Sequence, residues 1–115
     1  LGADIVELHT GTYCERALDN HARALADELT RLAMAAAAAD ERGLEVHAGH
    51  GLTYNTVEAV ARLPQVVELN IGHFLIGEAI FGGLSPAVRH MRALMDGARA
   101  AAAPRAAPPV PRRLG

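Results

Sequence analysis

Apolar and polar residues alternate in three short stretches of the chain, VELHTG at 6–11, LEVHAG at 44–49 and VELNIG at 67–72. Alternate side chains of a strand point to opposite faces, so each stretch predicts a strand with one polar and one apolar face. We expect the apolar faces to pack under helices. The polar pairs are Glu7 with His9, Glu45 with His47 and Glu68 with Asn70, and the apolar pairs are Val6 with Leu8, Leu44 with Val46 and Val67 with Leu69.

Helical periodicity fills the two segments between these strands. Apolar residues recur at helical spacing from Asn20 to Arg42, and Gly43 provides a stop signal, which together predict a long helix. A shorter helix is predicted over Asn55–Leu63, with Asn55 as its N-cap and Glu58 three residues later.

Two further helices are predicted after the third strand. The first is a short helix over His73–Phe81, which Gly82 and the glycine after it bring to an end. Ser85 and Pro86 then predict the N-cap and first residue of a last helix. The predicted buried stripe of that last helix consists of Val88, Met91, Leu94 and Met95.

The order of these elements is typical of parallel strands joined by right-handed helical crossovers, the α/β class. A polar strand face suits the lumen of a barrel better than a doubly wound sheet, which helices cover on both sides. An eight-fold barrel takes about 250 residues, so three βα units are less than half of one. We therefore expect residues 1–103 to be part of a TIM barrel and 104–115 to be a Pro/Arg-rich disordered tail. Leu1 stands directly before a strand pattern, which favours a fragment of a longer protein.

Composition excludes several classes of function. A formal charge of −2 gives no electrostatic preference for nucleic acid or for an anionic membrane. No apolar run approaches the roughly 20 residues that span a bilayer. Cys14 is the only cysteine, so no internal disulfide can form, and we expect a reducing, cytoplasmic location.

The candidate chemistry gathers where the predicted strands end. In barrels, function collects at these carboxyl ends, and phosphate binding after the last strands beside a short helix is a recurrent device. Gly51, and Gly72 with His73, are placed to let backbone N–H groups approach a phosphate. His50 stands between two glycines, and an imidazole titrates near neutral pH, which suits an acid/base catalyst. Glu7 is predicted to point into the lumen.

Each of these residues also has a structural interpretation. His73 could cap the short helix or bind a backbone carbonyl, His50 could be a turn residue, and Glu7 could be a structural carboxylate paired with Arg. Tyr13 and Tyr54 either wall the pocket or pack within loops. Cys14 follows a strand end closely, where it is either part of the site or, as we favour, a bystander.

A metal site is a further alternative. Zinc requires three or four ligands, and four histidines stand at or near the predicted strand ends. No closely spaced ligand pair such as a helical His-x-x-x-His supports it, and we expect no metal. The four histidines are His9, His47, His50 and His73.

The segments VELHTGTY, GLEVHAGHGLTYNTV and VVELNIGHFLIGEAIFGGLSPAVRHM together resemble the C-terminal portion of the pyridoxine 5′-phosphate synthase family. The resemblance runs from about Gly2 to Leu94 and implies the C-terminal three βα units of a (β/α)8 barrel, with a short extra helix after the last strand. It implies condensation of 1-deoxy-D-xylulose 5-phosphate with 3-amino-2-oxopropyl phosphate to pyridoxine 5′-phosphate, phosphate and water. It also implies no metal or organic cofactor, and a homo-oligomer of the complete barrel.

The resemblance also implies roles for individual residues. His50 matches the family's proton donor, and Gly51 matches a ligand-binding glycine beside it. Gly72 with His73 matches the pair that contacts the aminooxopropyl phosphate, and Glu7 matches an inward glutamate near the reacting groups. The family's N-terminal half, with further catalytic and phosphate-binding residues, has no counterpart here, so we expect this chain alone to be inactive.

Two other functions remain open at this stage. One is a different phosphate-handling barrel, such as an isomerase or an aldolase, although a Schiff-base aldolase would need a lysine and the chain contains none. The other is a non-catalytic remnant that binds phosphate and pairs with a complementary half-barrel or with itself.

Overall fold

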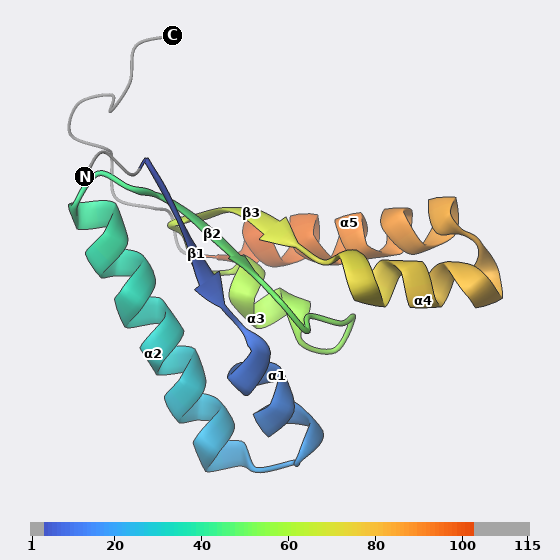
Figure 1. Ribbon diagram of the computed structural model, residues 1–115, viewed down its shortest axis with the longest axis horizontal. Helices are drawn as coiled ribbons and strands as arrows, with labels where there is room; N and C mark the ends of the chain where they lie inside the picture. Colours follow the sequence, from blue (N-terminus) through green and yellow to red (C-terminus); the bar gives the residue numbers. More distant parts are fainter. Residues whose placement is uncertain (1–3, 103–115) are drawn as a thin grey trace, which may run out of the picture.

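The computed structural model describes residues 4–102, which form one three-stranded sheet and its helices (Figure 1). The chain alternates between strands and helices, as the polar and apolar pattern predicts. In chain order, the elements are β1 (Ile5–His9), α1 (Gly11–Leu18), α2 (Ala22–Glu41), β2 (Glu45–Gly49), α3 (Val57–Ala61), β3 (Val66–Asn70), α4 (Gly72–Gly82) and α5 (Leu84–Ala101).

The sheet is parallel and has the order β1-β2-β3, so β2 lies in the centre. Parallel neighbours need a crossover, which α1 and α2 provide between β1 and β2, and α3 between β2 and β3 (Figure 1). The predicted α/β class with parallel strands is confirmed. The pairing aligns Glu7 with His47 and His47 with Glu68, so the predicted polar face is a continuous row across the sheet.

One extra residue interrupts the register of β3. Val46 pairs with Val66, but the next residue of β2, His47, pairs with Glu68. This irregularity, of the kind called a β-bulge, leaves Val67 without a partner and turns it outward. The prediction that Val67 packs under the helices is therefore wrong: Val67 is 53% exposed, whereas Val66 is buried in its place.

The core lies between the apolar face of the sheet and the helices. Helix α2 packs against β1 and β2, α3 packs against β3, and α5 lies against α3. Ala36 of α2 is completely buried, which shows how closely this helix approaches the sheet. The buried residues of the cluster are Tyr13, Cys14, Leu32, Ala36, Ala39, Val46, Ala48, Leu52, Val60 and Val66.

The helix predictions hold for α2, within two residues at either end, and for α4, within one. Helix α1 was not predicted, because its eight residues follow directly on the strand end and are too few to show a clear helical period. The predicted N-cap of α3, Asn55, is wrong. Thr56 occupies that position, and its hydroxyl accepts a hydrogen bond from the N–H of Thr53 at 2.8 Å.

Helix α5 begins at Leu84, earlier than the Ser85–Pro86 signal predicts. Gly83 occupies the cap position with a φ of 91°, a conformation that glycine adopts freely, and this lets α5 turn back along α4. Of the predicted stripe, Met91 is buried, but Val88 is 44% exposed. The predicted tail at 104–115 lies outside the described residues.

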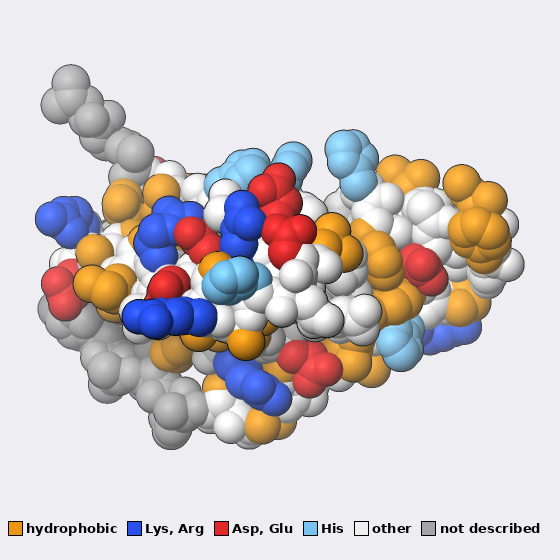
Figure 2. Space-filling model, turned by 90° about the horizontal axis from the view of Figure 1, so that it is seen from below, with side chains coloured by type: hydrophobic (Ala, Val, Ile, Leu, Met, Phe, Trp, Pro, Cys, Tyr) orange, Lys and Arg blue, Asp and Glu red, His pale blue; other side chains and the backbone are white. Residues whose placement is uncertain are grey.

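Helices α4 and α5 form a hairpin that extends beyond the sheet (Figure 1). Large apolar side chains gather on it, at the right-hand end of the molecule in Figure 2. We call these residues the hairpin patch: Ile76, Ile80, Phe81, Leu84 and Val88. None of the helices within residues 4–102 has the length and apolar character needed to cross a membrane.

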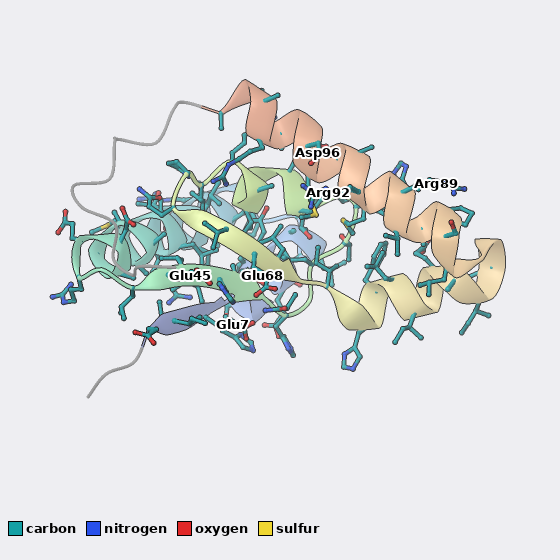
Figure 3. The ribbon with its side chains drawn as sticks, turned by 90° about the horizontal axis from the view of Figure 1, so that it is seen from above. Glu7, Glu45, Glu68, Arg89, Arg92 and Asp96 are labelled. Carbon is teal, nitrogen blue, oxygen red and sulfur yellow. The ribbon has the colours of Figure 1, made fainter. Side chains whose placement is uncertain are left out.

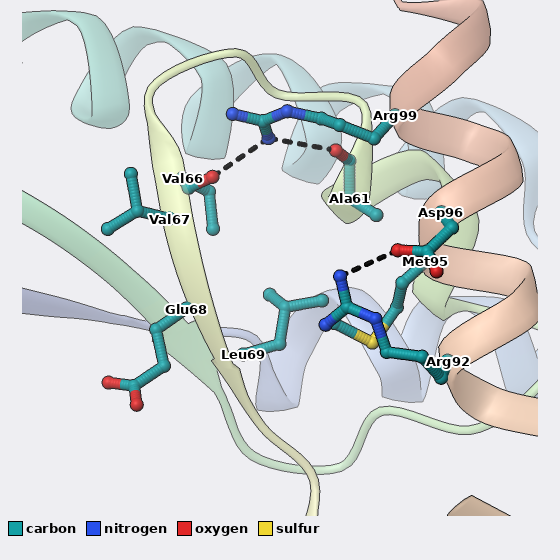
Figure 4. A pocket seen from close by; sticks show the side chains of 9 residues that line it. All are labelled: Ala61, Val66, Val67, Glu68, Leu69, Arg92, Met95, Asp96 and Arg99. Carbon is teal, nitrogen blue, oxygen red and sulfur yellow. Dashed lines mark hydrogen bonds and ion pairs between the residues drawn. The ribbon is translucent and has the colours of Figure 1, made fainter. Parts of the chain in front are cut away.

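Arg99 of α5 fastens the turn between α3 and β3. Its guanidinium donates hydrogen bonds to the carbonyls of Ala61, Leu63, Pro64 and Val66, at 2.8–3.2 Å (Figure 4 shows two of them). These carbonyls stand at the end of α3 and the start of β3, where the helix leaves its last acceptors unpaired. One side chain therefore ties the position of β3 to α5.

We predict that Arg99→Ala lowers the free energy of unfolding by about 1–3 kcal/mol, because it deprives several carbonyls of a charged donor. Urea unfolding of the chain measures this. The matched control is Arg92→Ala on the same helix, whose partner Asp96, at 2.6 Å, belongs to an exposed ion pair (Figure 4). Equal losses in the two variants would contradict the role of Arg99.

Candidate active site

A cavity of about 570 Å³ lies at the carboxyl ends of the strands. All five residues predicted for the site from the sequence line it, and they come from three separate strands or the turns that follow them. The sheet brings them together because parallel strands end at one edge. The lining residues are Glu7, His50, Gly51, Leu52, Asn70, Ile71, Gly72, His73 and Phe74.

Glu7 is held from across the sheet. Asn70 donates a hydrogen bond from its amide nitrogen to the Glu7 carboxylate, although β2 lies between the two strands. Gly49 of β2 makes this contact feasible, since a Cβ there would lie 2.9 Å from the Cβ of Asn70. The partner of Glu7 in the structure is thus the neutral amide of Asn70 and not the arginine that the sequence suggested as a partner. The amide orients the carboxylate without cancelling its charge.

His47 lies in the same row of the sheet as Glu7, but it does not line the cavity. Its two ring nitrogens each lie 2.7 Å from a carboxylate oxygen, one of Glu45 and one of Glu68. Figure 3 shows Glu7, Glu45 and Glu68 on the side of the sheet that faces away from α5. A carboxylate accepts hydrogen bonds but does not donate them, so both contacts act together only when each ring nitrogen bears a proton.

His50 follows β2 in a backbone conformation that side chains disfavour. Its φ is 88°, and Gly51 after it has a φ of 83°, so the chain makes two left-handed steps in succession. The carbonyl of His50 accepts a hydrogen bond of 2.7 Å from the Thr10 hydroxyl. A Cβ at Gly51 would lie 3.3 Å from the Cβ of Cys14, so this position lacks room as well as a favourable φ.

The imidazoles of His9 and His50 stack, with ring centroids 4.2 Å apart and planes at 27°. The Nδ1 of His9 accepts a hydrogen bond of 3.2 Å from the N–H of Gly11. From the sequence, His9 had no role beyond that of a possible metal ligand, and Thr10, Gly11 and Asn70 were not predicted as site residues. Their only signal in the sequence is their place in strand ends, HTG and LNIG.

Helix α4 begins at the cavity with Gly72 and His73. Its N-cap is Ile71, and no side chain there caps the helix, so the suggestion that His73 serves as the cap is wrong. A Cβ added at Gly72 would meet no atom within 4 Å. Gly72 and His73 also line the cavity, so the start of α4, which carries the positive end of the helix dipole, is accessible from it.

Cys14 and Tyr13 lie in the core beneath the site. Burial is the main cause that raises the pKa of the Cys14 thiol, which keeps it protonated and unreactive near neutral pH. The Tyr13 hydroxyl donates to the carbonyl of Thr56 at 2.9 Å. Tyr54 packs edge-on against Phe74 and His90, outside the cavity. Tyr13 thus packs in the core and Tyr54 against α4 and α5, and neither lines the cavity.

The histidines considered as metal ligands do not form one cluster. His9 and His50 stack, His47 is engaged by carboxylates, and His73 stands on α4. Within residues 4–102, no group of three or more His, Cys, Asp or Glu side chains is arranged to hold a metal ion.

One cavity of this parallel α/β sheet combines a helix N-terminus, an imidazole and a carboxylate. The class of protein that this arrangement defines is an α/β protein with a strand-end site suited to an anionic small molecule. Residues 1–97 match the family described as "Pyridoxal phosphate biosynthesis protein PdxJ". The chain belongs to this family, which confirms the resemblance noted in the sequence.

Curated relatives are similar over most of this chain. The pyridoxine 5′-phosphate synthase of Roseobacter denitrificans is 57% identical over 100 residues, 87% of this chain and 40% of that protein. The synthases of Caulobacter sp. strain K31 and Ruegeria pomeroyi are 59% and 58% identical, with 39% and 40% of their lengths covered. The chain thus spans about two fifths of the length of the curated relatives it matches.

We predict that His50→Gly gives a more stable chain than His50→Ala, because only alanine keeps a Cβ at the positive φ. Both variants lose the imidazole, so the difference isolates the backbone. In ordinary positions glycine costs about 0.5–1 kcal/mol relative to alanine. Urea unfolding compares the two, with Thr30→Gly and Thr30→Ala on α2 as the control pair that keeps the usual order. The usual order at position 50 would mean that its backbone is unstrained.

Proposed function

We propose that this chain is the C-terminal three βα units of a (β/α)8 barrel with pyridoxine 5′-phosphate synthase activity. The reaction would join 1-deoxy-D-xylulose 5-phosphate to 3-amino-2-oxopropyl phosphate and release phosphate and water. The observation that supports it is the cavity of about 570 Å³, which Glu7, His50, Gly51, Gly72 and His73 all line. Family membership and the printed names of the relatives agree with this proposal.

The first turn of α4 would bind a phosphate of the substrate. Gly72 and His73 supply backbone N–H groups at the helix start, where the dipole favours an anion. The open space in front of Gly72 leaves room for phosphate oxygens. Gly51, which also lines the cavity, would let the backbone of the β2–α3 loop approach the ligand closely.

His50 would act as the general acid that protonates a departing oxygen during ring formation, and as a base when the proton returns. Glu7, oriented by Asn70, would transfer protons or orient the amine-bearing substrate through its carboxylate. Ring formation needs several proton transfers and two dehydrations. The chain spans 40% of the Roseobacter denitrificans protein, so the other catalytic groups would come from the remaining units, and this chain alone would not turn over.

A full-length chimera tests these roles, with this chain in place of the matching 100 residues of the Roseobacter denitrificans synthase. We predict that His50→Ala lowers kcat by about 10²–10⁴-fold, the usual contribution of general acid/base catalysis. The KM for 3-amino-2-oxopropyl phosphate should change little, since His50 is assigned to proton transfer. Steady-state kinetics with both substrates measures this.

Gly72→Val provides the matched comparison in the same chimera. It should raise the KM for 3-amino-2-oxopropyl phosphate and leave kcat less affected, because it fills the space in front of α4. Normal turnover with His50→Ala would remove His50 from the mechanism. A chimera that binds phosphate but never turns over would favour the alternative that this chain is a non-catalytic remnant. That alternative is consistent with the chain's coverage of 40% of the Roseobacter denitrificans protein.

We also propose that the complete barrel forms a homo-oligomer through the hairpin patch. Phe81 is 90% exposed near the end of α4, in the hairpin that extends beyond the sheet (Figure 1). Phe81→Glu should dissociate the chimera in sedimentation velocity. Leu18→Glu, at a residue 86% exposed on α1, is the matched control that should leave the assembly intact. An unchanged mass with Phe81→Glu would exclude this surface.

A further inference from the structure

Three consecutive residues of one βα unit contact His50, which belongs to the next. We propose that His9, Thr10 and Gly11 form a cradle that positions the His50 imidazole for turnover. They act through His50 and are positioning residues, not catalytic ones. This inference rests on the catalytic role proposed for His50, and it adds three residues to which the sequence analysis gave no such role.

Thr10 holds the backbone of His50. It is completely buried, and its N–H extends the sheet by donating to the carbonyl of Gly49 at 2.8 Å. Its hydroxyl donates to the carbonyl of His50 at 2.7 Å. The two bonds bracket the point at which the backbone turns left-handed, so Thr10 holds the conformation that the φ of 88° makes costly, and the Cys14 thiol adds a longer contact of 3.8 Å to the same carbonyl.

His9 holds the ring of His50. The two imidazoles stack at a centroid distance of 4.2 Å, which restricts rotation of the His50 side chain. The His9 ring is itself fixed, because its Nδ1 accepts the N–H of Gly11 at 3.2 Å. In the neutral ring the proton must then reside on Nε2. The stack occupies one face of His50 and leaves its edge for the substrate.

Gly11 leaves room for both rings. A Cβ at this position would lie 2.6 Å from Cε1 of His9 and 3.1 Å from Cδ2 of His50. The first distance is shorter than real Cβ contacts, so a side chain here would displace the stack. The three residues thus act on the backbone of His50, on its ring and on the space both rings need.

The chimera described above tests the cradle. We expect Thr10→Val and His9→Ala to lower kcat by about 10–100-fold, the scale of a small misplacement of a catalytic group. The KM values should stay near normal. Thr10→Ser keeps the hydroxyl and should retain most of the activity. His9→Phe keeps a flat ring and should retain more activity than His9→Ala. Thr30→Val is the matched control on α2, where the hydroxyl bonds only within its helix at 3.0 Å, and its activity should be unchanged.

A double-mutant cycle separates positioning from a general structural effect. If the cradle acts through His50, then Thr10→Val and His9→Ala cause no further loss of kcat in the His50→Ala background. Equal losses in both backgrounds would overturn the inference, and so would near-normal kcat for both single variants. If His50→Ala itself left kcat unchanged, the proposed catalytic role of His50 would be wrong, and the inference that the cradle positions His50 for turnover would be wrong with it.

Discussion

The structure of the candidate site depends on the register of three parallel strands. His9, Gly49 and Asn70 stand in one row across β1, β2 and β3. Because the central member of this row has no side chain, Asn70 reaches over β2 and binds Glu7 on the far strand. A shift of one residue would reverse the faces of a strand and break this contact. The cavity exists because all three strands end at the same edge.

The left-handed turn at His50 and Gly51 is the costly element in this arrangement. The turn places the His50 imidazole at the cavity, and the cost is an unfavourable φ of 88° at that residue. Neighbouring structure compensates, since Thr10 binds the carbonyl and the buried side of Gly51 fits against Cys14. Strain maintained by its surroundings at a cavity is a frequent property of functional residues.

The two faces of the sheet differ in polarity and in what covers them. Helices bury the apolar face, while the other presents Glu7, Glu45 and Glu68 with His47 between two of the carboxylates (Figure 3). A polar face of this kind suits a closed barrel lumen. Within the described residues, β1 and β3 are the edge strands of the sheet. Arg99 keeps β3, one of these two edge strands, attached to α5.

The sequence by itself determined the elements with a clear period and the residues at strand ends. Alternation predicted the strands, helical spacing predicted α2, and a pair of glycines predicted the end of α4. Strand-end motifs led to the family and to the proposal of Glu7, His50 and Gly72 as site residues. Tertiary structure decided what depends on partners distant in the chain. Thr10 and His50 are 40 residues apart, and Asn70 and Glu7 are 63 apart. The exposure of Val67 likewise follows from pairing with β2. Periodicity reports only which face a residue prefers, whereas register and packing decide which residues meet.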